Sequence, residues 1–119
     1  MKAKPRVLIC GDRGWRDYQK IYDALKKLMP VALVIEGEAQ GADRLGRAAA
    51  EQLGVPVLKF PADWTRYGRA AGSIRNEQQL REGQPTYWLA FHPDLENSKG
   101  TGDMVRRLRK AGIPGEVIV

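Results

Sequence analysis

A glycine-bearing turn between an apolar run and a helical segment constrains the fold more than any other feature of this sequence. Residues 31–35 (VALVI) are typical of a strand, residues 37–43 (GEAQGAD) of a turn, and residues 42–53 of a helix. The first N–H groups of a helix have no partners within it and lie at the positive end of its dipole. Because glycine also lets a ligand approach the backbone closely, this unit predicts an anion site.

Strand and helix signals alternate along the whole chain. We expect strands at residues 6–10, 31–35, 55–60, 87–91 and 116–119, and helices at residues 18–29, 42–53, 69–81 and 102–110. Short links between alternating elements favour a parallel sheet with helices on both faces. We therefore predict a single α/β domain over residues 1–119, with a three-layer, Rossmann-like, doubly wound and mostly parallel five-stranded sheet. The expected strand order is 3-2-1-4-5, with Pro56 marking an edge strand.

Composition narrows the classes of partner. The chain has 119 residues, a net charge of +6 and a pI near 9.7, which favours anionic partners such as nucleotides, nucleic acid or acidic proteins. No apolar run approaches the ~20 residues that cross a bilayer, so we expect no membrane association. The lone Cys10 lies in an apolar strand and cannot form an internal disulfide. These features favour a cytoplasmic protein.

The loop after the first strand contains a candidate phosphate ligand. Gly11 begins this loop, and Arg13 follows shortly after the strand end. The planar guanidinium of Arg13 can clamp a phosphate, although an exposed arginine in a surface turn is the alternative. Trp15 can either stack on a base or cover the first helix.

The loop after the second strand contains glycines and carboxylates. Gly37 and Gly41 suit the backbone geometry of the turn whether or not a ligand binds. Asp43 can accept a hydrogen bond from a ribose hydroxyl, or it can simply stabilise the start of its helix. Glu36 or Glu38 can contact a ribose in the same way or orient a water molecule.

The loop after the fourth strand also suits a phosphate. Ser98, Gly100 and Thr101 offer N–H groups and hydroxyls, and the alternative is a flexible loop that ends in a helix cap. Neither this loop nor the others match the Walker GxxxxGK[ST] pattern or the dinucleotide GxGxxG pattern. The sequence therefore argues against an ordinary ATPase or dehydrogenase.

A fourth segment is expected to border the same crevice. Small residues around Gly68 and Gly72 suit a close approach to a ligand or to another chain, and Trp64 can cover a base. Arg75 can face a phosphate or carboxylate, whereas Asn76 can read a base edge or brace a loop; a plain helix surface is the alternative. His92 is the only histidine, so we expect no metal site.

Taken together, these motifs resemble a known family. The chain is similar to the YspA-like (cpYpsA-related) branch of the SLOG superfamily, which is named for the DNA-processing protein DprA/Smf and the Lonely Guy (LOG) enzymes. The resemblance implies a Rossmann-like fold and a nucleotide-type ligand at glycine-rich loops. The motifs that carry it occur in the family's order: Gly11–Arg13, Gly37–Asp43, Phe60–Trp64, Gly68–Gly72, Arg75–Asn76 and Ser98–Thr101.

The resemblance leaves three functions open. A sensor or effector domain that binds a nucleotide derivative, with no cofactor, is the leading interpretation. LOG enzymes cleave a nucleoside monophosphate to base and ribose 5-phosphate; this chain resembles them at Arg75 and Gly100–Thr101, but Met104 stands where they carry a catalytic glutamate. In a hydrolase Arg75 would be catalytic, with Asp103, Glu38 or, in our assignment, Asp43 supplying the carboxylate. A DprA-like single-strand binder is the third interpretation, and the small residues 70–72 suit a homodimer contact.

Overall fold

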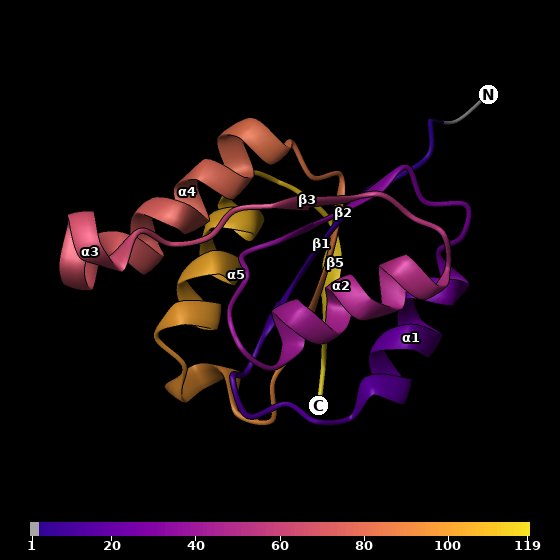
Figure 1. Cartoon of the computed structure of the whole chain (residues 1–119), viewed down its shortest axis with the longest axis horizontal. Helices are drawn as coiled ribbons and strands as arrows, with labels where there is room; N and C mark the ends of the chain where they lie inside the picture. Colours follow the sequence, from indigo (N-terminus) through magenta and orange to yellow (C-terminus); the bar gives the residue numbers. More distant parts are fainter. Residues whose placement is uncertain (1–2) are drawn as a thin grey trace.

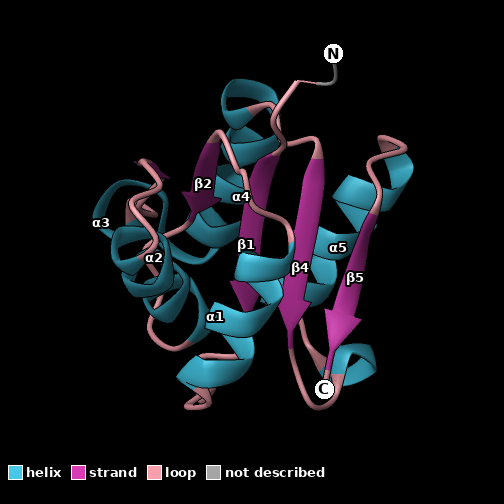
Figure 2. Ribbon diagram, turned by 90° about the vertical axis from the view of Figure 1, so that its right-hand side faces the viewer, coloured by secondary structure: helices cyan, strands magenta, loops and turns pink. Residues whose placement is uncertain are grey.

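The computed structural model describes residues 3–119 and is built around one five-stranded sheet in the order β3-β2-β1-β4-β5. All four strand pairings are parallel, and the strand arrows in Figure 2 point the same way. The predicted fold class and strand order are confirmed, and the sheet is parallel throughout rather than mostly. The strands are β1 (Arg6–Gly11), β2 (Leu33–Glu36), β3 (Val57–Lys59), β4 (Tyr87–Phe91) and β5 (Gly115–Ile118).

Helices cover both faces of the sheet and complete the three layers seen in Figure 1. Helices α1 (Tyr18–Lys27) and α2 (Ala42–Gln52) pack on one face, while α4 (Ala71–Gly83) and α5 (Gly100–Lys110) pack on the other. Between them lie the short helix α3 (Trp64–Tyr67) and the 3-10 turns η1 (Gly68–Ala70) and η2 (Leu95–Asn97). Among residues 3–119, no helix is both long and apolar enough to span a membrane.

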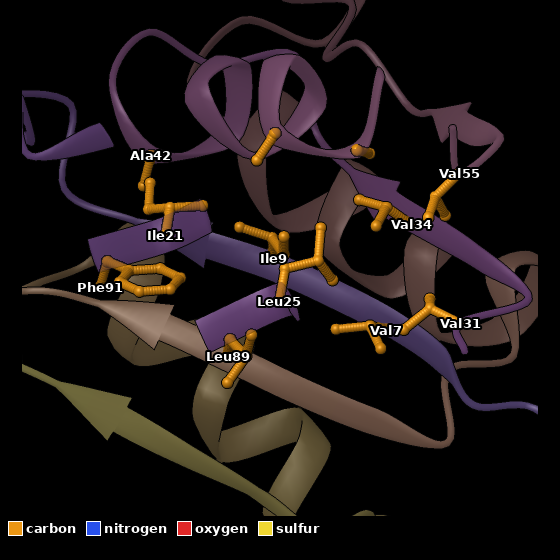
Figure 3. Packing of buried hydrophobic residues seen from close by; sticks show 12 residues of the cluster. Val7, Ile9, Ile21, Leu25, Val31, Val34, Ala42, Val55, Leu89 and Phe91 are labelled. Atoms are coloured by element: carbon orange, nitrogen blue, oxygen red, sulfur yellow. The ribbon is translucent and has the colours of Figure 1, made fainter. Parts of the chain in front are cut away.

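Alternation along β1 divides the core into two clusters. Val7 and Ile9 face α1 and α2, where they pack with Ile21 and Leu25, as Figure 3 shows. The intervening residues of β1, Leu8 and Cys10, belong to the cluster beneath α5. Because successive side chains of a strand point to opposite faces, a continuous apolar run is what a strand covered on both sides requires.

The strand order places a topological switch between β1 and β4. The chain leaves β1 towards β2 on one side, and returns across the sheet to β4 on the other. The connections after β1 and β4 therefore separate at the carboxyl ends of these strands and leave a crevice there.

Two segments predicted as loops are helical. Trp64–Tyr67 forms α3 because the Asp63 carboxylate accepts a hydrogen bond from the Arg66 N–H at 3.0 Å and caps the turn. Helix α5 begins at Gly100 rather than at Gly102, because the Ser98 hydroxyl accepts from the N–H groups of Thr101 and Gly102 at 3.1 and 3.3 Å. A side-chain cap of this kind extends a helix beyond its apolar pattern.

The remaining predicted bounds shift at the element ends. Residues 31–32 and 55–56 precede their strands, since the β2 register begins at Leu33 opposite Arg6 and β3 pairs only over Val57–Lys59. Helix α1 ends at Lys27 rather than residue 29, and the third predicted helix begins at Ala71 after the η1 turn rather than at residue 69. Strand β5 starts at Gly115 and ends at Ile118. The edge position predicted from Pro56 is correct, because β3 pairs only with β2.

Candidate functional site

A cavity of about 510 Å³ lies at the carboxyl ends of β1 and β4, between α4 and the start of α5. It brings together segments that are far apart in the sequence, namely the loop after β1, α3, one face of α4 and the loop before α5. Most of the residues proposed from the sequence line it: Gly11, Arg13, Asp43, Trp64, Arg75, Asn76, Ser98, Gly100 and Thr101.

Gly37 and Gly41 do not line the cavity but shape its wall. A Cβ atom on Gly37 would lie 2.6 Å from Arg75 Nη1, and the Gly37 carbonyl accepts a hydrogen bond from that nitrogen. Gly41 has a φ of +76°, and a Cβ there would lie 2.3 Å from the Asp12 carbonyl oxygen. Both glycines therefore permit close approach between chain segments.

The amides of the glycine turn are largely engaged within the protein. The Ala42 N–H at the start of α2 donates to the Asp12 carbonyl at 3.2 Å. The carboxylate of Asp43 accepts from the N–H groups of Gly37 at 3.1 Å and Ala39 at 3.3 Å. These three amides thus donate to the protein's own carbonyl and carboxylate oxygens.

Asp43 is a buried carboxyl group that borders the cavity, with 5% of its surface exposed. Burial raises its pKa to about 6, although the positive charge of Arg75 and the two backbone N–H groups oppose this rise. A carboxyl group with such a pKa exchanges its proton close to neutral pH.

Glu36 and Glu38 lie outside the cavity lining. Glu36 is fully buried at the end of β2, and its Oε2 accepts from the Glu38 N–H at 2.8 Å while its Oε1 has no protein partner. Burial, together with the neighbouring Glu38 and Asp43 carboxylates, raises the Glu36 pKa to about 8. Glu38 is ion-paired with Arg47. The contacts of both glutamates are therefore with the turn and with α2 rather than with the cavity.

A hydrogen-bond network links α4 to α5 behind the cavity. Asn76 Oδ1 accepts from Arg75 Nε at 3.1 Å, and Asn76 Nδ2 donates to the Gly100 carbonyl at 3.2 Å and to Asp103 Oδ2 at 3.0 Å. Arg107 Nε also donates to Asp103 Oδ2, at 2.9 Å. Of the two roles considered for Asn76, bracing a loop is the one that these contacts describe.

Asp103 remains ionised within this network. Burial by itself raises its pKa, but hydrogen bonds from Asn76 and Arg107, and the charges of Arg107 and Arg106, outweigh that effect and lower it. Arg107 Nη2 additionally donates to Ser73 Oγ at 2.9 Å. The Asp103 carboxylate is therefore committed to holding α4 and α5 together.

Trp64 and Arg13 form one rim of the cavity. The Arg13 guanidinium lies 5.8 Å from the centre of the Trp64 ring, which is half exposed and packs beside Gly72. Trp15, by contrast, packs on Phe91 with ring centres 5.6 Å apart and donates from Nε1 to the Asp17 carbonyl. Trp15 therefore covers the core, and Trp64 is the indole at the cavity.

Comparison with known proteins identifies the family of the chain. The model of the "YspA, cpYpsA-related SLOG family" matches residues 5–67. The chain belongs to this family. It is also 38% identical to the Gene 61 protein of Mycobacterium phage D29 over 118 residues, a match that covers 92% of each chain. No solved structure matches the chain significantly. The resemblance drawn from the six motifs is thus confirmed.

Several cavity residues of this SLOG chain were not singled out from its sequence as ligand contacts. On α4 a recoverable signal exists, because Gly72, Asn76 and Gln79 recur at helical spacing on the face that carries Arg75. The others follow no short motif, since tertiary packing alone places them beside the cavity. The residues missed are Cys10, Asp12, Ala39, Arg69, Ser73, Gln79, His92, Lys99 and Met104.

Cationic side chains outnumber carboxyl groups in the cavity lining. Four cationic side chains line it: Arg13, Arg69, Arg75 and Lys99. Within residues 3–119, no carboxylate forms an ion pair with any of these four. Three carboxyl groups also line the cavity: Asp12, Asp43, which accepts from backbone amides, and Asp103, which accepts from Asn76 and Arg107. The cavity therefore favours an anionic guest over a cation, and no group of three or more His, Cys, Asp or Glu residues in the described chain suits a metal ion.

Proposed function

We propose that this SLOG protein binds a nucleotide or a nucleotide-derived molecule in the cavity at the β1–β4 switch, as a sensor or effector. The observation that carries the proposal is the convergence of four cations without ion-pair partners and one half-exposed indole on a single cavity. Family membership supports a nucleotide-related ligand, and ligands of doubly wound sheets bind at such switch points.

The lining suggests how such a ligand would be held. Arg13, Arg69 and Lys99 would neutralise phosphate charge, and the Ser98 hydroxyl can donate while it accepts from the start of α5. Trp64 would stack on the base, since an exposed indole offers an aromatic face. Asp43 would accept from a ribose hydroxyl deeper in the cavity.

A thermal-shift screen tests this proposal. The panel contains AMP, GMP, ADP, ATP, ADP-ribose and NAD, and a ligand at ~100 times its Kd should stabilise the fold by roughly 2.7 kcal/mol. Arg13→Gln should weaken binding of the ligand found. Arg81→Gln is the matched control, because Arg81 is exposed on α4 and ion-paired with Glu77 outside the cavity. The absence of any shift across the panel would overturn the proposal.

Asp43 favours a second candidate function, hydrolysis of an N-glycosidic bond. Its pKa of about 6 and its place beside the cavity suit a general acid or base near neutral pH. In this reaction water adds to C1′, and the bond from C1′ to the base nitrogen breaks with its electron pair going to that nitrogen. Asp43 would accept one proton of the attacking water and release it to the departing base, so that free base and ribose 5-phosphate are formed. Arg75 would hold the anionic part of the substrate. Met104 offers no carboxylate, and Asp103 is held by Asn76 and Arg107.

Release of free base from nucleoside monophosphates is the measurement that decides between binding and turnover. If the protein is a hydrolase, Asp43→Asn should reduce release at least 100-fold, within the usual range for loss of an acid–base group. Asp23→Asn, at an exposed position on α1, is the control. Release of base that persists in Asp43→Asn would show that another group is the general base. If no monophosphate releases its base, the hydrolase proposal is wrong and ligand binding without turnover remains.

Binding of a single-stranded nucleic acid has less support, because basic residues of α5 already contact other residues of the chain. Arg107 bonds to Asp103 and Ser73, and the Arg109 guanidinium lies 5.6 Å from the centre of the Trp88 ring. Residues 70–72 also offer little exposed surface to a second subunit, because Ala71 is buried and Gly72 packs beside Trp64.

A further inference from the structure

Gln79 lines the cavity and carries a buried acceptor without a partner. It lies on α4 one turn after Arg75 and is only 2% exposed. Its Nε2 donates to the Met104 thioether at 3.8 Å, and its Oε1 has no hydrogen-bond partner in the described chain. Because a thioether sulfur can only accept, this contact orients the amide and leaves Oε1 as the unpaired atom.

No group of the described chain donates a hydrogen bond to this oxygen. The Met104 thioether that Nε2 contacts has no proton to donate. Buried polar atoms almost always have a partner, and exceptions often mark a functional position or an ordered water. Glu36 carries the other unpaired buried side-chain oxygen among residues 3–119, but it does not line the cavity. The Gln79 oxygen differs from that of Glu36 in belonging to a residue that lines the cavity, so a small turn of its side chain would bring Oε1 to a bound ligand.

We propose that Gln79 selects the ligand by accepting a hydrogen bond from an uncharged donor, either a sugar hydroxyl or a base N–H, at the Met104 side of the cavity. The inference rests on the proposed nucleotide-binding function and adds a residue that chooses among nucleotides. Arg13, Arg69 and Lys99 would attract any phosphate, whereas Gln79 would distinguish ligands of equal charge. A site built to pair with a donor rejects an analogue that lacks it, because its own buried group is then left unpaired.

The unliganded protein gives the first test. Gln79→Met conserves volume and removes the unpaired amide, so we expect a thermal midpoint about 4 °C above that of the wild type. Gln78→Met is the matched control, since Gln78 is the adjacent residue of α4 and does not line the cavity; its midpoint should change little. A marked fall of the midpoint in Gln79→Met alone would show that Oε1 is already satisfied, and would overturn the inference.

Affinities for matched nucleotides give the second test. The adenine series is AMP, 2′-deoxy-AMP and purine riboside monophosphate, and the guanine series is GMP, 2′-deoxy-GMP and IMP. We expect the wild type to bind the parent of one series about tenfold tighter than one of its analogues, and Gln79→Met to abolish that difference. Loss of preference against the deoxy analogue identifies a sugar hydroxyl, and loss against the analogue without an amino group identifies the base.

The outcomes separate the two proposals. If the wild type binds a parent nucleotide but Gln79→Met retains the full preference, the inference about Gln79 is wrong and the proposed function stands. Equal wild-type affinity for a parent and both of its analogues would also show that the inference about Gln79 is wrong while the proposed function stands. If neither series binds, the inference is overturned, and the broader panel that includes ADP-ribose and NAD decides the proposed function separately.

Discussion

Gly37 and Arg75 share space that only a residue without a side chain leaves open. A Cβ atom at position 37 would lie 2.6 Å from Arg75 Nη1 and 2.9 Å from its Cδ and Cζ. Gly37→Ala should therefore displace the guanidinium, lower the free energy of unfolding by about 1–3 kcal/mol and weaken nucleotide binding. Urea unfolding and titration with the best ligand of the screen measure both effects.

The matched control for Gly37 is Gly14→Ala in the loop after β1. A Cβ there would meet Asp12 Oδ2 at 3.4 Å, which is an ordinary contact, and Gly14 does not line the cavity. We expect its stability to remain within about 0.5 kcal/mol of the wild type. Equal effects of the two substitutions would contradict the role assigned to the Gly37–Arg75 contact.

Asn76 contributes buried hydrogen bonds to the junction of α4 and α5. Asn76→Ala removes hydrogen bonds to Gly100 and Asp103 at a buried position, so we expect a loss of about 1–3 kcal/mol in the free energy of unfolding. Asn97→Ala removes a bond to Asp94 at an exposed position and should cost far less. Denaturant unfolding of both variants checks this, and similar losses would show that burial does not decide the cost.

At the scale of elements, the space around a glycine within a helix shows how closely that helix packs against its neighbours. Ala is a better helix former than Gly by about 1 kcal/mol, but a Cβ at Gly46 in α2 would lie 2.7 Å from Ile9 Cγ2 in β1. Gly46→Ala should therefore destabilise the protein by about 1–3 kcal/mol through overpacking. A Cβ at Gly102 in α5 would meet the end of Arg106 at 3.3 Å and the Leu95 carbonyl oxygen at an ordinary 3.6 Å, so Gly102→Ala should be neutral or stabilising. Thermal unfolding measures both, and a stabilising Gly46→Ala would contradict the α2–β1 packing.

Element type and order could be predicted because they follow from periodic burial. The strands β1 and β4 are continuous in apolar character, and α1 and α2 each bury one face. Helix α3 and the first turn of α5 could not be predicted in this way. Each depends on one side chain, Asp63 or Ser98, that accepts from N–H groups at a helix start, and such caps also occur in loops.

At the scale of the whole molecule, the strand order explains how much of the site could be predicted. Loops that follow β1 and β4 must meet at the switch point, so Arg13 and Thr101 could be assigned to one cavity from topology. The hydrogen-bond partners of the turn amides could not be predicted from the sequence. The Ala42 N–H, for example, donates to the Asp12 carbonyl, which belongs to a loop distant in sequence. Contacts between segments remote in sequence leave no local pattern.

Two buried carboxyl groups beside the glycine turn couple the stability of the whole fold to pH. Burial raises the pKa of Glu36 to about 8 and that of Asp43 to about 6, from usual values of 4.5 and 3.8. Between the usual and the raised values, the folded state binds more protons than the unfolded state. The free energy of unfolding contributed by these groups therefore falls as pH rises from about 4 to about 8.

Glu36→Gln removes the larger of these two titrations. The amide cannot ionise, and its oxygen can still accept from the Glu38 N–H. We expect the variant to be more stable than the wild type by on the order of 2–4 kcal/mol at pH 9, because only the wild type must then hold a buried charge. At pH 4.5 the advantage should largely disappear, since Glu36 is protonated in the folded protein. Urea unfolding from pH 4.5 to 9 measures this difference, with the exposed Glu51→Gln as control; a difference that stays constant over this range would show that Glu36 does not titrate on folding.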